Sequence, residues 1–353
     1  MLSPARVGAG READMDTRRY LVGLAVVGLV ACGGTAPEDT AGGVVEPEAV
    51  EALAPADPGI RNVSILHLNV ADMDRSLAWY QGVLGMETVR DNGGPSPTQI
   101  VPEEGAMMHT VILETPGGEF SMELVEVSGV ELQPQQPSVQ DPGAVMLAMV
   151  VADLDGALAG ARDLGLEMLS EEVVVTDARG PQAMVRDADG FVSYLSQATE
   201  PGAESVLLEF TFVSVDDMVE TVDFYNGVFG LELEEPGELT PTSARILGLV
   251  GDPALAMFRL TSDFAFAGTD GTLRFQEFGG AEQTAVRHRV QDPGGPILTM
   301  TVDDFAGVME RVEALGGTIG DGETSATLAA DASFSWIRDP NGLLIRVSAS
   351  PAP

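Results

Sequence analysis

Apolar residues recur along this chain with two periods, one of three to four residues, typical of helices, and one of two, typical of strands. The clearest helical pattern begins after Asp72, a suitable N-cap, and ends at Gly85, a suitable helix terminator. Its apolar face consists of Met73, Leu77, Tyr80 and Leu84. Strand patterns surround this helix and predict a β-α-β-β-β module, with strands over residues 63–70, 86–90, 107–114 and 119–127.

The helix pattern occurs a second time, from Asp217 to Gly230. The apolar spacing is the same, at Met218, Val222, Tyr225 and Phe229. Another repeated segment reads Val-Gln-Asp-Pro-Gly and starts at Val139 and again at Val290. Repeats this far apart indicate duplicated domains rather than a solenoid of short units.

Two further modules follow the first and the third. The second is predicted to hold a strand over 145–151, a helix over 153–164 and strands over 172–175, 182–186 and 191–196. The fourth is predicted to hold a strand over 297–302, a helix over 304–315 and strands over 336–338 and 343–347. An Asp-x-[Asp/Asn]-Gly turn, at Asp187 and at Asp339, precedes each last strand. We therefore expect an α+β fold of paired βαβββ modules in two tandem domains, residues 60–198 and 205–350.

The N-terminal segment has the pattern of a targeting signal. An apolar run over residues 21–31 follows two arginines and is too short to span a bilayer. It ends in Leu-Val-Ala before Cys32, which resembles the lipobox of bacterial lipoproteins. We expect residues 1–32 to be a lipoprotein signal peptide ending at a lipidated Cys32, and residues 33–59 to be a disordered tether. The resemblance implies a lipid anchor in the bacterial cell envelope, at the outer membrane and facing the periplasm.

The net charge of the chain disfavours some classes of binding partner. The chain has 18 basic residues, all of them arginine, against 55 acidic ones, and its net charge is -37. Nucleic-acid binding requires basic surface to displace counterions, so this class is disfavoured. Electrostatic adhesion to anionic lipid is disfavoured for the same reason. The absence of lysine from the sequence excludes Schiff-base chemistry on a lysine.

The modules together resemble the vicinal oxygen chelate superfamily, which includes glyoxalases, bleomycin-resistance proteins and dioxygenases. The resemblance rests on the Asp-capped helices that end in Tyr-x-Gly-Val-[Leu/Phe]-Gly and on the Asp-x-[Asp/Asn]-Gly turns. It covers about residues 60–350. It implies that paired modules curl their sheets into cups and that ligands sit in these cups.

The resemblance also implies where a divalent metal would be held. In metal-dependent members, a His or Gln starts the first strand of a module and a Glu lies in the last strand. The matching first-strand positions are Ile65, Met146, Phe210 and Ile297. The matching last-strand positions are Glu123, Tyr194, Gln276 and Arg346. Three or four oxygen or imidazole donors are therefore not provided, and we expect no cofactor. A divalent metal held by His67 and Glu123 is the alternative.

Glu123 has two interpretations. As a general base it would abstract a proton next to a carbonyl, assisted by His67 or Tyr194. As a binding group it would accept a hydrogen bond from a small ligand, with Asn69 and Tyr194 nearby. Without a metal or another oxyanion stabiliser, the first reaction loses its main electrostatic aid, so binding is favoured. The other interpretation of His67 is a cup-lining or core imidazole satisfied by a neighbour.

Two arginines suggest the chemistry of a ligand. Arg274 and Arg346 have the strand parity of cup-facing residues, with Thr299 and Thr301 opposite. The prediction is that the cup of the second domain binds an anion or a carboxylate. The alternative is that these arginines pair with the many carboxylates of the chain. His288, on the loop before the fourth module, is expected at the surface.

These patterns favour a membrane-anchored, glyoxalase-like protein that binds or sequesters a small molecule without a metal. An enzyme of the glyoxalase or dioxygenase type, a lyase or isomerase built around His67 and Glu123, is the alternative. A structural role with both cups degenerate is a third interpretation. The expected partners are a small-molecule ligand and, through the lipid, a membrane, whereas a homodimer is left open.

Overall fold

A computed structural model defines the positions of most residues after the predicted tether. The described residues are 57–98, 100–101, 103–116, 120–170, 173–176, 180–199, 207–234, 237–241, 257–260, 264–265, 272–279, 282–320 and 334–350. All of them lie in one compact unit of the chain. The predicted signal peptide, Cys32 and all but the last three residues of the predicted tether lie outside the described residues. Within the described part, no helix has the length and hydrophobicity needed to span a bilayer.

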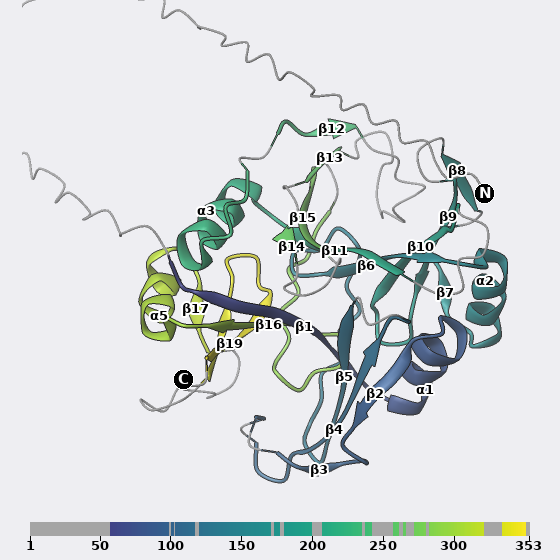
Figure 1. The fold of residues 1–353 in the computed structure, drawn as a ribbon, viewed down its shortest axis with the longest axis horizontal. Coiled ribbons are helices and arrows are strands. Elements are labelled where there is room, and N and C mark those ends of the chain that lie inside the picture. Colours follow the sequence, from purple (N-terminus) through teal and green to yellow (C-terminus); the bar gives the residue numbers. More distant parts are fainter. Residues whose placement is uncertain are drawn as a thin grey trace, which may run out of the picture. The chain divides into compact units, whose positions relative to one another are not determined.

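Two sheets contain the described strands (Figure 1). Sheet A has the order β17-β18-β19-β16-β1-β5-β4-β2, with β3 paired to β4. It combines strands of the first and fourth modules: β1 (Ile60–Val70), β2 (Glu87–Asp91), β3 (Ser96–Pro97), β4 (Met107–Glu114), β5 (Ser121–Ser128), β16 (Pro296–Val302), β17 (Thr318–Ile319), β18 (Phe334–Arg338) and β19 (Leu344–Ala349).

Sheet B combines strands of the second and third modules. Its order is β12-β13-β15-β11-β6-β10-β9-β7, with β14 paired to β15 and β8 to β9. The strands are β6 (Val145–Val151), β7 (Glu167–Met168), β8 (Val174–Thr176), β9 (Gly180–Arg186), β10 (Val192–Gln197), β11 (Leu207–Val215), β12 (Thr240–Pro241), β13 (Met257–Leu260), β14 (Phe264–Ala265) and β15 (Thr272–Gly279).

The sheets cross the boundary between the two tandem domains. In sheet A, β1 runs antiparallel to β16, with His67 opposite Ile297. In sheet B, β6 runs antiparallel to β11, with Met146 opposite Phe212. The tandem domains predicted from the sequence place the first module with the second in one cup, and the third with the fourth in the other. The structure instead joins the first module to the fourth and the second to the third. This grouping determines which side chains can meet in a cup.

Each long helix begins at an aspartate, as the sequence predicts. The helices are α1 (Met73–Leu77), which continues as a π-helical turn η1 (Ala78–Val83), then α2 (Leu154–Asp163), α3 (Met218–Phe229) and α5 (Phe305–Ala314). The N-cap carboxylates of Asp72, Asp153, Asp217 and Asp304 accept backbone N–H groups of the first turn. The π-turn departs from the predicted regular helix, because the N–H of Leu84 donates to the carbonyl of Trp79 at 3.0 Å.

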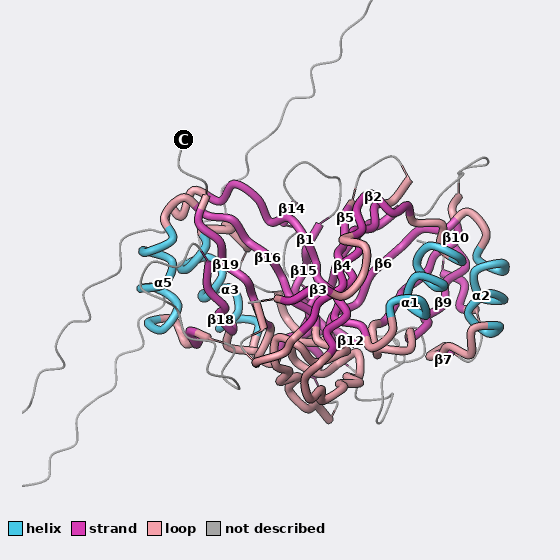
Figure 2. Tube along the Cα trace, turned by 90° about the horizontal axis from the view of Figure 1, so that it is seen from below, coloured by secondary structure: helices cyan, strands magenta, loops and turns pink. Residues whose placement is uncertain are grey.

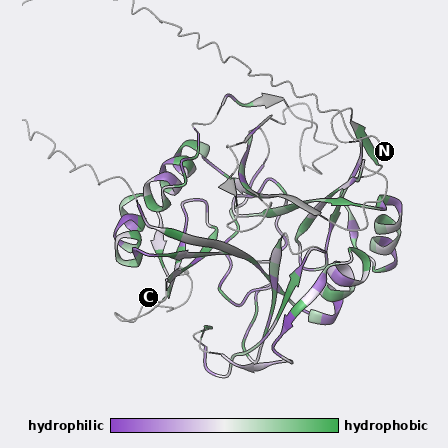
Figure 3. Ribbon diagram, in the orientation of Figure 1, coloured by the Kyte–Doolittle hydropathy of each residue, from purple (hydrophilic) through white to green (hydrophobic). Residues whose placement is uncertain are grey.

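The helices join the modules that the sheets leave apart. Helix α2 packs against η1, and α3 packs against α5 (Figure 2). Each module therefore contacts one partner through a sheet and another through a helix. The helices are amphipathic, with hydrophobic and hydrophilic residues along each (Figure 3). In α2, for example, the buried face is Leu154, Ala157, Leu158 and Ala161.

Two buried contacts, which we call helix–turn locks, connect the capped helices to the Asp-x-[Asp/Asn]-Gly turns. The Tyr80 hydroxyl donates to Asp187 Oδ2 at 2.8 Å, and the Tyr225 hydroxyl donates to Asp339 Oδ2 at 3.0 Å. The other carboxylate oxygen accepts two backbone N–H groups in Asp187, from Asp189 and Phe191, and one in Asp339, from Leu343. The capped helix and the Asp-x-[Asp/Asn]-Gly turn each occur twice in the sequence. They are therefore the two sides of one structural contact, which the protein makes twice.

The third residue of each Asp-x-[Asp/Asn]-Gly turn also makes an equivalent contact in both copies. The side chains of Asp189 and Asn341 accept the backbone N–H of the second residue before the helix, from Ala71 at 2.9 Å and from Asp216 at 2.8 Å. These bonds tie the start of each helix to the neighbouring module. The duplicated residues thus have a docking role, which leaves the chemistry to other positions.

His288 corrects one expectation. We expected a surface residue, but its exposed fraction is 0%. Its backbone carbonyl accepts a hydrogen bond from Arg338 Nη2 at 2.7 Å, and its ring lies against Gly295. The loop that carries it is therefore part of the interior, because the two Val-Gln-Asp-Pro-Gly segments hold it there. The N–H of Val286 donates to the carbonyl of Pro142 at 2.8 Å within this arrangement.

Candidate functional site

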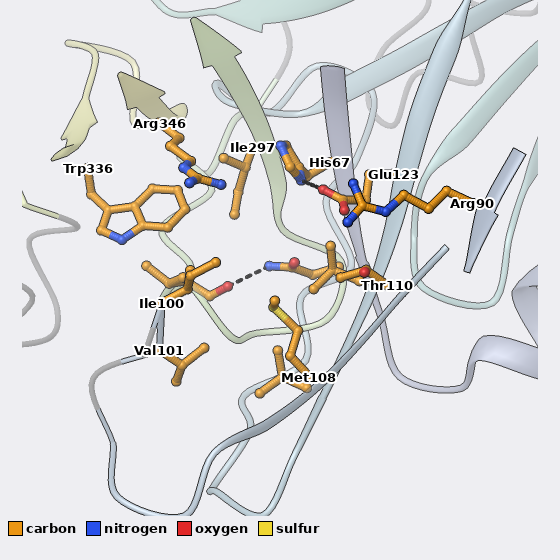
Figure 4. A pocket seen from close by; sticks show the side chains of 14 residues that line it. His67, Arg90, Ile100, Val101, Met108, Thr110, Glu123, Ile297, Trp336 and Arg346 are labelled. Atoms are coloured by element: carbon orange, nitrogen blue, oxygen red, sulfur yellow. Dashed lines mark hydrogen bonds and ion pairs between the residues drawn. The ribbon is translucent and has the colours of Figure 1, made fainter. Parts of the chain in front are cut away.

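A cavity of about 130 Å³ lies against sheet A (Figure 4). Strands of the first and fourth modules contribute side chains to it, so it lies across the β1–β16 pairing. The lining residues are His67, Asn69, Arg90, Ile100, Val101, Met108, Thr110, Glu123, Val125, Val127, Val290, Ile297, Trp336 and Arg346. Three of the predicted binding residues, His67, Asn69 and Glu123, are thereby brought together with a fourth, Arg346.

His67 and Glu123 form the polar centre of this cavity. The parallel pairing of β1 with β5 places them side by side in register. His67 Nδ1 lies 2.5 Å from Glu123 Oε2, and His67 Nε2 lies 2.5 Å from Thr299 Oγ1. Both ring nitrogens are therefore occupied by neighbours. This is the dyad that the sequence suggested, and Thr299 fixes the far side of the imidazole.

The electrostatics of Glu123 favour its ionised form. Burial raises the pKa of this carboxyl, but the hydrogen bond and charge of His67 and the charges of Arg346 and Arg90 lower it by more. The pKa of Glu123 consequently lies below its ordinary value. The cavity thus holds a carboxylate that accepts hydrogen bonds and is surrounded by cationic groups.

Two arginines reach the cavity on either side of the His67–Glu123 pair (Figure 4). Arg346 comes from β19 and Arg90 from β2. The Arg346 guanidinium lies over the Phe334 ring, 4.8 Å from its centroid, which holds it in place. Burial lowers the pKa of Arg346, and the charge of Glu123 opposes this effect. The buried Nε of Arg346 has no hydrogen-bond partner among the described residues.

Apolar side chains form the remaining walls. Ile297 and Trp336 are 3% and 6% exposed and pack in a cluster with Val101, Val125 and Val127. Asn69 and Thr110 are the polar exceptions, and the Nδ2 of Asn69 donates to the carbonyl of Val290 at 2.8 Å. A cavity with apolar walls and a few converging polar groups is the usual form of a small-molecule site.

The other two predicted binding residues lie in sheet B. Tyr194 on β10 is opposite Ala148 in register, and its hydroxyl is hydrogen-bonded to Gln182. Arg274 on β15 is opposite Phe212. The sequence predicts that Tyr194 lies with Glu123 and Arg274 with Arg346, but the observed pairing of the modules puts the members of each pair in different sheets. The corresponding face of sheet B packs an apolar cluster of Val139, Met146, Ala148, Met184, Val192, Phe212 and Phe278, with Tyr194 against it.

The sequence patterns do not point to two cavity residues, Arg90 and Trp336, or to Thr299 as the partner of His67. Arg90 follows a register shift in the pairing of β2 with β4, and this irregularity re-aims the strand. Trp336 is opposite Arg346 across β18 and β19. The sequence could have indicated Trp336, since Trp336 and Arg346 occupy matching positions in neighbouring strands of one module.

The residues at the implied metal positions do not fit a divalent cation. The register puts His67 rather than Ile65 beside Glu123, and Thr299 rather than Ile297 beside Arg346. The four converging side chains are then an imidazole, a carboxylate, a hydroxyl and a guanidinium. A guanidinium has no lone pair to donate and carries the charge that a metal would bring. Within the described residues, no group of three or more His, Cys, Asp or Glu side chains is arranged to hold a metal ion.

Comparison with known proteins identifies the fold and the family. Residues 62–192 and 207–347 each match the family model described as the Glyoxalase/Bleomycin resistance protein/Dioxygenase superfamily. The structure is similar to glyoxalase I from Zea mays, with a TM-score of 0.53 at 17% identity, covering 82% of this chain and 92% of that one.

A mutant of the same maize enzyme gives a TM-score of 0.52 at 16% identity, covering 82% and 94% of the two chains. No curated protein matches the sequence significantly. The predicted fold and family are confirmed by these matches and by the βαβββ modules described above. The chain belongs to the Glyoxalase/Bleomycin resistance protein/Dioxygenase superfamily, with two copies of its domain.

Proposed function

We propose that this protein binds a small molecule in the cavity of sheet A and that fixed side chains, rather than a metal, hold it. The observation that carries the proposal is the cavity itself, in which apolar walls surround the His67–Glu123 pair. Such a site orients a ligand by a few hydrogen bonds and gains affinity from the apolar area that the ligand covers.

The character of the polar groups supports binding over catalysis. Glu123 is an ionised base, but both nitrogens of its neighbour His67 are engaged by side chains. Proton abstraction next to a carbonyl needs a stabiliser for the developing oxyanion, and the donor set does not fit the metal that would supply one. The same groups are well suited to hold a bound ligand in one orientation.

Trp336 offers a direct test of binding. The chain has two tryptophans: Trp336 lines the cavity, whereas Trp79 is 1% exposed within the main core. We expect a titration with a panel of small ring-containing compounds to give saturable changes in tryptophan fluorescence, equal in the presence and absence of EDTA. In Trp336→Phe, the fluorescence change should vanish while calorimetry still detects binding.

A cavity-filling variant provides the control. Val125→Phe should fill the cavity and weaken binding by roughly tenfold or more. Val175→Phe is the matched substitution, since Val175 is 71% exposed on β8, and it should leave affinity unchanged. Absence of saturable binding across the panel, or equal binding by the Val125→Phe variant, would contradict the proposed function. Affinity that disappears with EDTA would contradict the metal-independent part.

We further propose that a lipid on Cys32 anchors the protein to the bacterial cell envelope, at the outer membrane and facing the periplasm. The support is the apolar run that ends in Leu-Val-Ala-Cys-Gly. In a Gram-negative host, the full chain should sediment with membranes and incorporate labelled palmitate. Cys32→Ser should lose the label and move to the soluble periplasmic fraction. A membrane-bound Cys32→Ser protein would refute the lipid anchor.

A further inference from the structure

We infer that the ligand of the sheet A cavity is a small monocarboxylate with a flat apolar body, and that Arg346 and Arg90 bind its carboxylate. The inference rests on the proposed function and names the class of molecule that this cavity selects. It replaces the expectation that Arg274 and Arg346 share a cup, because Arg90 is the second arginine of this site.

The two arginines differ from five others in the described structure that have acidic partners. Carboxylates pair with the side chains of Arg75, Arg186, Arg259, Arg289 and Arg311. Arg346 and Arg90 make no hydrogen bond or ion pair with described residues, although both lie near enough to Glu123 to lower its pKa. The chain has 55 acidic residues, yet these two guanidinium groups face one cavity and form no ion pair with a described carboxylate. Both groups can therefore pair with the anionic group of a bound ligand.

Half-buried Arg346 needs such a partner more than exposed Arg90 does. Its Nε is buried without a hydrogen bond, and the desolvation that lowers its pKa is the free-energy deficit that a bound anion would offset. The Phe334 ring beneath it keeps the guanidinium facing the cavity, so little side-chain freedom remains to be lost on binding.

The charge balance of the cavity selects a monoanion. Two guanidinium groups and the His67 imidazole face one ionised carboxylate, Glu123, so an added anion meets an excess of cationic side chains. A carboxylate has the planar geometry that an arginine binds through two parallel hydrogen bonds, and it carries a single negative charge. A dianion such as a phosphonate brings a second negative charge close to Glu123, where like charges repel.

The size and walls of the cavity select the rest of the molecule. Its volume of about 130 Å³ is close to that of a cavity of about 150 Å³ that accepts benzene. Trp336 presents a flat face, and Ile297 and Val125 complete the apolar walls. A six-membered ring or a branched chain of similar size fits this space, with the carboxylate directed at Arg346.

The experiment compares benzoate with benzamide, its neutral isostere, and with phenylphosphonate, a dianion at pH 8. We expect benzoate to bind at least roughly tenfold more tightly than either, measured by calorimetry and by Trp336 fluorescence. The affinity for benzoate should fall as salt rises, whereas the affinity for benzamide should not. Arg346→Met should weaken benzoate by roughly tenfold or more and leave benzamide unchanged. Arg162→Met is the control, since this exposed arginine lies on α2, away from the cavity.

The outcomes separate this inference from the proposed function. Equal binding of benzoate and benzamide, or tighter binding of phenylphosphonate, would refute the monocarboxylate while leaving small-molecule binding intact. If no compound of the wider panel binds, both fail together. Should Arg346→Met not fold, the wild-type comparison of benzoate with benzamide and the Arg90→Met variant decide the question, because a retained benzoate affinity in Arg90→Met would refute the paired-arginine site.

Discussion

Gly294→Ala is expected to lower the free energy of unfolding by at least about 3 kcal/mol or to prevent folding. Gly294 ends the second Val-Gln-Asp-Pro-Gly segment and has a φ of +82°. A Cβ at this position would lie closer than 3 Å to the backbone carbonyl oxygens of Gln135 and Asp189. Backbone atoms of two other segments would have to shift, and one of these segments carries a helix–turn lock.

The first copy of the same segment supplies the matched control. Gly143 has a φ of +87°. A Cβ at this position would lie 3.4 Å from its nearest neighbours, atoms of Val286, which is an ordinary contact distance. Gly143→Ala should therefore lose only the conformational term of about 1–2 kcal/mol. Urea unfolding followed by circular dichroism measures both. Equal losses in the two variants would show that the close approach at Gly294 has no energetic consequence.

Asp187→Asn is expected to flatten the dependence of stability on pH. Burial, followed by the charge of Asp189, raises the pKa of Asp187 to about 7 in the folded protein, despite its hydrogen bonds from Tyr80 and two backbone N–H groups. Between the ordinary value near 4 and this value, the folded state binds a proton that the unfolded state has released. The stabilising contribution is therefore complete below about pH 4 and is lost as pH rises through 7.

The size of this effect follows from the shift. A change of about three pKa units corresponds to a loss on the order of 4 kcal/mol between pH 4 and pH 8. Asp339, in the second lock, has its pKa raised to about 6 by burial and should contribute a smaller loss over pH 4 to 7. Unfolding free energies of wild type, Asp187→Asn and Asp339→Asn at several pH values test this. A slope in Asp187→Asn as steep as in wild type would contradict the prediction.

The elements of the fold could be predicted because local patterns determine them. The strands β4 and β6 begin and end where alternation and turn residues predict, and the Asp-capped helices start within one residue of their expected positions. The π-turn of the first helix was not predicted, since the spacing of Met73, Leu77, Tyr80 and Leu84 also suits a regular helix.

The partner of each sheet could not be predicted, and this limited the site. Alternation states which face of a strand is apolar, but the identity of the neighbouring strand depends on contacts between distant segments. His67 and Glu123 were found because they belong to one module and pair within it. Arg346 was assigned to the other cup, since joining it to Glu123 requires the β1–β16 pairing.

The pairing of β1 with β16 has a consequence for how the protein is made. Ile60 pairs with Val302 and Leu68 with Pro296. The strand β1 therefore gains this partner only after β16, more than 200 residues later in the sequence, has been synthesised. At about 5–20 residues per second, roughly 10–50 s of synthesis separate the two strands. During this time one edge of β1 has no partner and is open to strands of other chains. Contacts of such long range also slow folding, so the yield of soluble protein should depend on factors that shield this edge until the C-terminal strands emerge.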